Sequence, residues 1–141
     1  MFNKSLTGKR RGMVAVLALL LVLAAAMSLS ACGGESPSDV VERVIEAYNQ
    51  QDFDTVYDAS SQTLQQAAGT REAAIEMLQV SFPPGAEIID LEITGETIDG
   101  DRATVTWTGT VKSIDLPEQK VDTEVRLIKE NGEWKVDQQS S

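Results

Sequence analysis

The sequence predicts an α+β domain in which N-terminal helices pack against an antiparallel sheet of about four strands. Apolar residues recur at helical spacing between residues 37 and 81, and from residue 87 onward they alternate with polar residues, as in strands. Residues 82–85, Phe-Pro-Pro-Gly, separate the two patterns, because two prolines and a glycine end a helix. Helices followed by consecutive strands pack as separate layers.

Residues 1–31 have the features of a signal peptide and are set aside before the fold is considered. Four basic residues precede an uncharged apolar run at residues 13–27. As a helix this run measures about 22 Å at roughly 1.5 Å per residue, whereas a membrane span needs about 20 apolar residues. We therefore expect a cleaved signal peptide. The alternative is a short membrane anchor.

Cys32 is the single cysteine of the chain and follows Leu29, Ser30 and Ala31 directly. This segment resembles the lipobox of bacterial lipoproteins. The resemblance implies cleavage before Cys32 and a diacylglycerol on its sulfur, with residues 32–36 as a short tether. The protein would then be lipid-anchored on the extracytoplasmic face of the cell membrane. The alternative is cleavage after Ser30, which would leave Cys32 as an exposed thiol.

The first helix is expected to begin at Pro37, with Ser36 as its cap and Asp39 completing a capping box. Five residues at helical spacing form its apolar face, namely Val40, Val41, Val44, Ile45 and Tyr48.

Two shorter helices are expected next. Asp52 is positioned to cap the first of them, and Thr70 is positioned to cap the second. Their apolar residues are Phe53, Val56 and Tyr57 in one, and Ala74, Ile75 and Leu78 in the other. The intervening residues 60–69 are polar and give no helical period.

The strands are predicted by alternation. In the first, Ile89, Leu91 and Ile93 alternate with polar residues, and a turn at residues 99–101 follows. The second strand alternates strictly, with Ala103, Val105, Trp107, Gly109 and Val111 on one face and Thr104, Thr106, Thr108 and Thr110 on the other.

After a loop at residues 115–119, a third strand is predicted over residues 120–130. The Asn131-Gly132 pair predicts a tight hairpin into the last strand, where Trp134 and Val136 are expected to face inward. One domain over residues 37–137 results, with a tail at residues 138–141.

Two segments, VIEAYNQQDFDTVYD (residues 44–58) and LIKENGEWKVD (residues 127–137), make the region 37–137 similar to the nuclear-transport-factor-two-like (cystatin-like) superfamily. More narrowly, the chain resembles small bacterial lipoproteins of that superfamily whose domains have no known function. The resemblance implies a curved sheet wrapped around helices into a cone with a pocket at its wide end. It also implies a homodimer formed through the sheet face.

Charge and composition exclude several classes of function. Beyond residue 31 the chain has eight basic and 22 acidic residues, a formal charge of −14, which repels nucleic acid and anionic lipid. The absence of histidine excludes catalytic triads and most zinc sites. Asp99 and Asp101 flank Gly100 as turn residues and lack the further oxygen ligands of a calcium loop. We expect no metal and no cofactor.

Four aromatic residues are candidates for the wall of a pocket: Tyr48, Tyr57, Trp107 and Trp134. Their alternative role is ordinary packing in the core. The acids of the strands fall on the polar side of the alternation and are expected to be solvated.

The sequence therefore favours a non-enzymatic binding or interaction module, for a small apolar ligand or for a membrane protein partner. The alternative is a small enzyme of the isomerase or dehydratase type. It would require a carboxylate base turned into the pocket, for which Asp54, Asp58 and Glu76 are the candidates.

Overall fold

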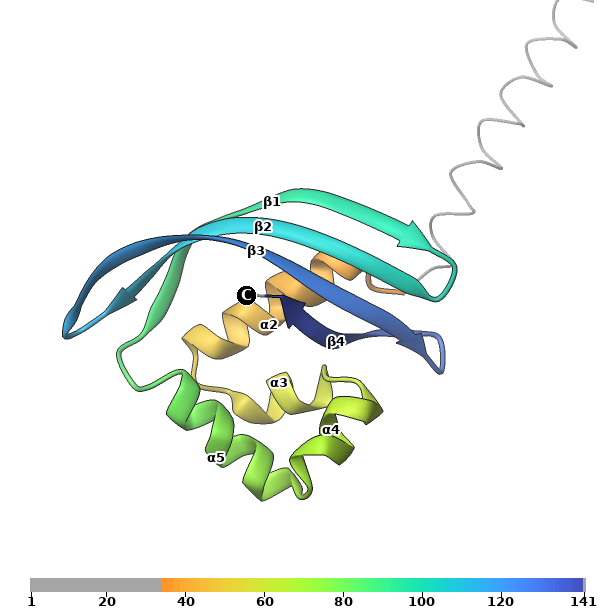
Figure 1. Cartoon of the computed structure of the whole chain (residues 1–141), viewed down its shortest axis with the longest axis horizontal. Coiled ribbons are helices and arrows are strands. Elements are labelled where there is room, and N and C mark those ends of the chain that lie inside the picture. Colours follow the sequence, from red (N-terminus) through yellow and green to blue (C-terminus); the bar gives the residue numbers. More distant parts are fainter. Residues whose placement is uncertain (1–33, 141) are drawn as a thin grey trace, which may run out of the picture. The chain divides into compact units, whose positions relative to one another are not determined.

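The computed structural model describes residues 34–140, and residues Glu35–Ser141 form one compact unit. Residues 1–33, with the predicted signal peptide, lie outside the described residues. Within the described part, helices precede strands, which confirms the α+β class (Figure 1). The elements are α2 (Pro37–Asn49), α3 (Phe53–Asp58), α4 (Gln62–Ala68), α5 (Arg71–Ser81), β1 (Glu87–Asp99), β2 (Arg102–Ser113), β3 (Leu116–Glu130) and β4 (Glu133–Ser140).

The start of α2 has the predicted capping box. The Asp39 N–H donates to Ser36 Oγ at 3.2 Å, and the Ser36 N–H donates to the Asp39 carboxylate at 3.1 Å. These hydrogen bonds hold the pKa of Asp39 below its ordinary value. Asp52 caps α3 and Thr70 caps α5, as expected. None of the helices within residues 34–140 is long and apolar enough to cross a membrane.

Helix α4 occupies the segment in which the sequence gave no helical period. Ser61 caps it, accepting from the Leu64 N–H at 3.2 Å, while the Ser61 hydroxyl donates to Asp137 Oδ1 at 2.7 Å. No residue of α4 is buried. A helix without a buried face leaves no apolar period in the sequence, which is why periodicity missed it.

The strands form one antiparallel sheet in the order β1-β2-β3-β4. Asn131 and Gly132 both have positive φ, 52° and 81°, as the predicted tight hairpin requires. Two strand boundaries differ from expectation. β3 begins at Leu116, so most of the predicted loop at residues 115–119 is strand. β4 continues to Ser140, into the predicted tail.

A β-bulge interrupts the first strand. Asp90 has φ of 52°, and the register of β1 against β2 shifts between Ile89 and Glu92. Ile88, Leu91 and Ile93 therefore pack against the core, and Ile89 does not join them. The predicted inward position of Ile89 is wrong, since an inserted residue reverses the side on which the preceding residues lie.

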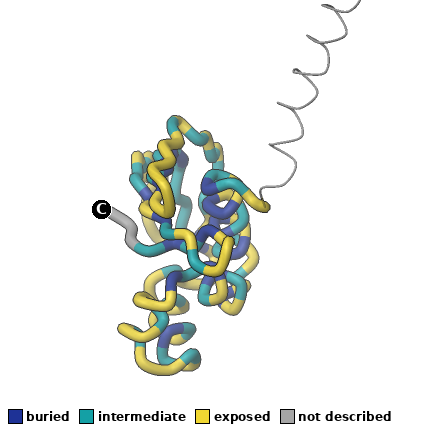
Figure 2. The backbone as a smooth tube through the Cα atoms, turned by 90° about the vertical axis from the view of Figure 1, so that its right-hand side faces the viewer, coloured by how far each residue is buried: buried dark blue, intermediate teal, exposed yellow. Residues whose placement is uncertain are grey.

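The core lies between α2 and the inner face of the sheet, which arches over this helix (Figure 1). Buried residues concentrate there, while α4 and α5 are mostly exposed or half-buried (Figure 2). The core residues include Val40, Val41, Val44 and Ile45 of α2, Ala103, Val105 and Trp107 of β2, Val125 and Leu127 of β3, and Trp134 and Val136 of β4.

The chain between α3 and α4 pairs with the outer edge of β4. The Ser61 N–H donates to the Val136 carbonyl at 2.7 Å, and the Val136 N–H donates to the Ala59 carbonyl at 2.8 Å. These bonds cover part of an exposed strand edge. They also place α3 and α4 beside α2, opposite the body of the sheet.

Candidate functional site

A cavity of about 450 Å³, here named the helix cavity, lies among α2, α3, α4 and α5. Its wall is almost wholly apolar and contains neither acidic nor basic side chains. The lining residues are Val44, Tyr48, Val56, Tyr57, Ser60, Leu64, Gln65, Ala68, Ala74, Met77, Leu78, Ser81 and Val136. Binding sites for small molecules have this size and this mostly apolar lining.

Arg71 ties α5 to α3 across one side of the helix cavity. Its Nη2 lies 2.6 Å from Asp54 Oδ1, and its Nη1 lies 2.7 Å from Asp58 Oδ1. The guanidinium carbon is also 4.8 Å from the centre of the Tyr57 ring. The hydrogen bonds to Asp58 and Asp54 raise the pKa of Arg71 above its ordinary value. These contacts position Tyr57 in the cavity wall.

Tyr48 closes another part of the helix cavity. Its ring centre is 5.2 Å from that of Phe82 and 6.2 Å from that of Phe53, and the second pair is edge-to-face. Burial raises the pKa of Tyr48, so its phenol is neutral at physiological pH. The cavity thus presents a neutral hydroxyl in an apolar wall.

A second cavity of about 200 Å³, here named the inner cavity, lies between α2 and the sheet. Its lining residues are Val41, Val44, Ile45, Tyr48, Ser81, Phe82, Ile88, Trp107, Val125 and Val136. Trp107 is 7% exposed. Its Nε1 is the buried side-chain nitrogen that has no hydrogen-bond partner within residues 34–140.

Asn49 fixes the wall of the inner cavity that β1 provides. Its Nδ2 donates to the Ile88 carbonyl and its Oδ1 accepts from the Ile88 N–H, both at 2.8 Å. The sequence analysis did not identify Asn49. A polar amide at the end of an otherwise apolar helix face was the signal available, and it is ambiguous because asparagine also ends helices by itself.

The structure brings three of the four predicted aromatic residues to these cavities. Tyr48 and Tyr57 line the helix cavity, and Trp107 lines the inner cavity with Tyr48. Trp134 instead lines a separate space of about 150 Å³ beside Glu35, Arg43, Glu133 and Lys135. Lys129 Nζ lies 5.4 Å from the centre of its ring. Trp134 faces inward as expected, but it belongs to a different part of the core.

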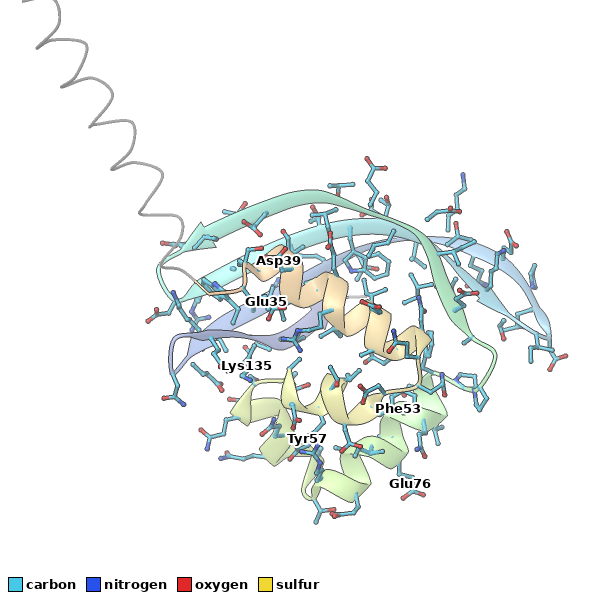
Figure 3. All side chains as sticks on the ribbon, turned by 180° about the vertical axis from the view of Figure 1, so that it is seen from behind. Glu35, Asp39, Phe53, Tyr57, Glu76 and Lys135 are labelled. Carbon is cyan, nitrogen blue, oxygen red and sulfur yellow. The ribbon has the colours of Figure 1, made fainter. Side chains whose placement is uncertain are left out.

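The acids named for the enzymatic alternative lie at the surface. Asp54 and Asp58 are exposed and pair with Arg71. Glu76 is exposed on α5 (Figure 3). None of the three lines either cavity, because each occupies the solvent side of a short amphipathic helix.

The remaining predicted positions are quickly placed. Asp99 ends β1, Asp101 follows it in the turn, and both are exposed. Within residues 34–140, no group of three His, Cys, Asp or Glu side chains is arranged to hold a metal ion. Leu29, Ser30, Ala31 and Cys32 lie outside the described residues, so the lipidation site stays a prediction.

The fold and the cavities together define a class: a small α+β domain whose helices enclose an apolar cavity on one side of an antiparallel sheet. Residues 39–141 match the family described as "Anti-sigma-I factor RsgI9, C-terminal domain", and the chain therefore belongs to this family.

Solved structures show the same fold at low sequence identity. A SEC-C motif containing protein from Rhodopseudomonas palustris superposes with a TM-score of 0.60 and 18% identity, over 75% of this chain and 78% of that one. A putative NTF2-like transpeptidase from Campylobacter jejuni gives a TM-score of 0.48 and 17% identity, over 74% of this chain and 99% of that one. No curated protein matches the sequence.

Proposed function

We propose that the chain is a non-enzymatic module that binds a small apolar molecule in the helix cavity. The observation that carries this proposal is the apolar wall, about 450 Å³ in volume, which includes no acidic or basic side chain. Closed apolar spaces of this size are costly unless something fills them. A general acid or base would have to come from a charged residue, and the wall supplies none.

A neutral fluorescent probe tests the proposal. We expect N-phenylnaphthylamine to bind the full chain with increased emission. Ala68→Phe fills the helix cavity and should weaken binding about tenfold, which corresponds to about 1.4 kcal/mol. Ala67→Phe is the matched control, because Ala67 is exposed on the same helix and does not line the cavity. Equal loss of binding in both variants would contradict the proposal.

We also propose that the module is held at the membrane by lipid on Cys32. The order of basic residues, apolar run, Leu29-Ser30-Ala31-Cys32 and Gly-Gly supports this proposal. Two or more acyl chains anchor a protein stably, whereas one does not. Cys32→Ala should move the protein from the membrane fraction to the soluble fraction, while Gly33→Ala should leave it there. Retention of Cys32→Ala in the membrane would refute the anchor.

The family name supports a regulatory role with a protein partner, since it describes a domain of an anti-sigma factor. We propose that the ligand state of the helix cavity is passed to such a partner. The tip of the β2–β3 hairpin is the contact surface we favour, because Ile114 and Leu116 expose apolar side chains there, 78% and 64%. A photo-crosslinking residue at position 114 should give a discrete adduct in cells, and one at exposed Ile98 should not.

A further inference from the structure

We propose that the ligand of the helix cavity carries a neutral carbonyl oxygen, and that this oxygen accepts a hydrogen bond from the indole N–H of Trp107 in the inner cavity. The inference rests on the proposed ligand-binding function and adds to it the chemical class of the ligand. It assigns Trp107 as the residue that selects this class.

The first step is the unpartnered donor. Trp107 is 7% exposed, and its Nε1 has no partner among residues 34–140. Buried tryptophan N–H groups usually find an acceptor, because an unpaired buried donor loses its hydrogen bond to water without replacement. An unsatisfied group of this kind is frequent at binding sites, where the ligand completes the bond.

The second step is the position of that donor. A methyl group at Gly109 would lie 3.1 Å from Cζ3 of the Trp107 ring, so the six-membered edge of the indole rests against Gly109. Nε1 belongs to the opposite edge of the indole, which points away from Gly109. Trp107 is also part of the inner cavity wall.

The third step is continuity between the two cavities. Four residues line both of them, namely Val44, Tyr48, Ser81 and Val136. A molecule with its apolar body in the helix cavity therefore reaches Trp107 with a group small enough for about 200 Å³. The apolar body supplies affinity, and the single polar contact fixes orientation.

The fourth step is the charge of the acceptor. Neither cavity is lined by lysine or arginine, and the chain beyond residue 31 is strongly acidic. A carboxylate or phosphate buried there would lack a counter-ion and would be repelled by the surrounding charge. A ketone, ester or amide oxygen accepts the same hydrogen bond without that cost. A neutral carbonyl is thus the acceptor that this site favours.

Two isosteric probes test the assignment in the full chain. 2-Acetylnaphthalene and 2-ethylnaphthalene share the apolar body and differ in the carbonyl oxygen. Their Kd values are measured by calorimetry with the natural chain and with Trp107→Phe. Phenylalanine keeps an aromatic ring but has no N–H. We expect the ratio of the two Kd values to shift about fivefold against the acetyl probe in Trp107→Phe, the usual effect of one neutral hydrogen bond.

Indole proton NMR of the natural chain gives an independent readout that does not depend on the folding of the variant. The acetyl probe should move the Trp107 N–H resonance downfield, and the ethyl probe should not. Trp134 lines neither cavity and serves as the internal control.

The two proposals fail differently. Binding of both probes, with an unchanged ratio in Trp107→Phe and an unmoved Trp107 resonance, would overturn the carbonyl assignment and leave apolar binding standing. A lack of binding by either probe would overturn the ligand-binding function and the assignment together.

Discussion

At the scale of single residues, Tyr48 couples packing to ionisation. Burial raises its pKa above the ordinary value near 10. Between the pKa of the unfolded chain and that of the folded one, the folded state binds more protons, so the free energy of unfolding falls as pH rises. The contribution is fully present below about pH 10 and is lost as pH rises through the folded pKa.

Tyr48→Phe should therefore flatten the alkaline limb of the stability profile. Phenylalanine keeps the contacts to Phe82 and Phe53 and has no proton to lose. Urea unfolding at a series of pH values from 8 to about 11 measures the effect. Parallel decline of the natural chain and the variant would show that Tyr48 is not the group responsible.

Gly109 is the second residue at which packing is tight. A Cβ atom there would lie 3.1 Å from Trp107 Cζ3 and 3.2 Å from the Ile89 carbonyl oxygen. Gly109→Val should lower the free energy of unfolding by about 1–3 kcal/mol through overpacking. Thr108→Val is the matched control, since position 108 lies on the outer face of the same strand. A neutral or stabilising Gly109→Val would contradict this packing argument.

Residue-level prediction succeeded where the signal was local. Ser36 and Asp39 form the predicted cap because a capping box needs only neighbouring atoms. It failed for the role of Trp134, whose inward direction follows from alternation but whose neighbours do not. Alternation gives the side of a sheet, and the position along the strand decides which cavity the side chain meets.

At the scale of elements, α5 is attached differently from α2. Helix α2 packs on the sheet, whereas the main contacts of α5 are with α3 and α4. Arg71 makes two of the connections to α3, through Asp54 and Asp58. We expect α5 to open more readily than the sheet, because it contributes only Ala74 to the buried residues.

Arg71→Met should accelerate amide hydrogen exchange in α5 and leave exchange in β2 nearly unchanged. The difference between variant and natural chain should shrink at high salt, because exposed ion pairs are screened. Mass spectrometry of deuterated peptides resolves the two segments. Arg126→Met on β3 serves as the control and should not affect α5. A uniform acceleration in both segments would mean that Arg71 supports the whole fold and not α5 alone.

Elements were predicted in proportion to the depth of their burial. The strongly amphipathic α2 and the strictly alternating β2 were found with nearly correct bounds. Helix α4 was missed because none of its residues is buried, and with it the lining residues Leu64 and Ala68. The bulge at Asp90 was missed because an inserted residue leaves no mark in composition.

At the scale of the whole molecule, the cavities depend on how α3, α4 and α5 are placed against α2. The sequence predicts that these helices are amphipathic, but their crossing positions are set by contacts distant in sequence. The pairing of residues 59–61 with β4 and the clamp at Arg71 are two such contacts. Net charge, in contrast, is a sum over residues and is fully known from the sequence.

Charge also governs the predicted homodimer. The outer face of the sheet carries Glu92 and Asp122 on either side of Thr108, in register across three strands. A dimer through this face would bring two such acidic rows together, each on a chain with a formal charge of −14 beyond residue 31. The Debye length falls from about 10 Å at 0.1 M salt to about 3 Å at 1 M. Salt should therefore strengthen the dimer.

Sedimentation velocity at low and high salt tests this expectation, with the dimer fraction rising as salt is added. Thr108→Asp adds one negative charge to the outer face and should weaken the dimer, most strongly at low salt. Gln66→Asp adds the same charge on exposed α4 and should have little effect, because α4 lies apart from the sheet's outer face. A dimer that dissociates on addition of salt, or that responds equally to both variants, would place the interface elsewhere on the molecule.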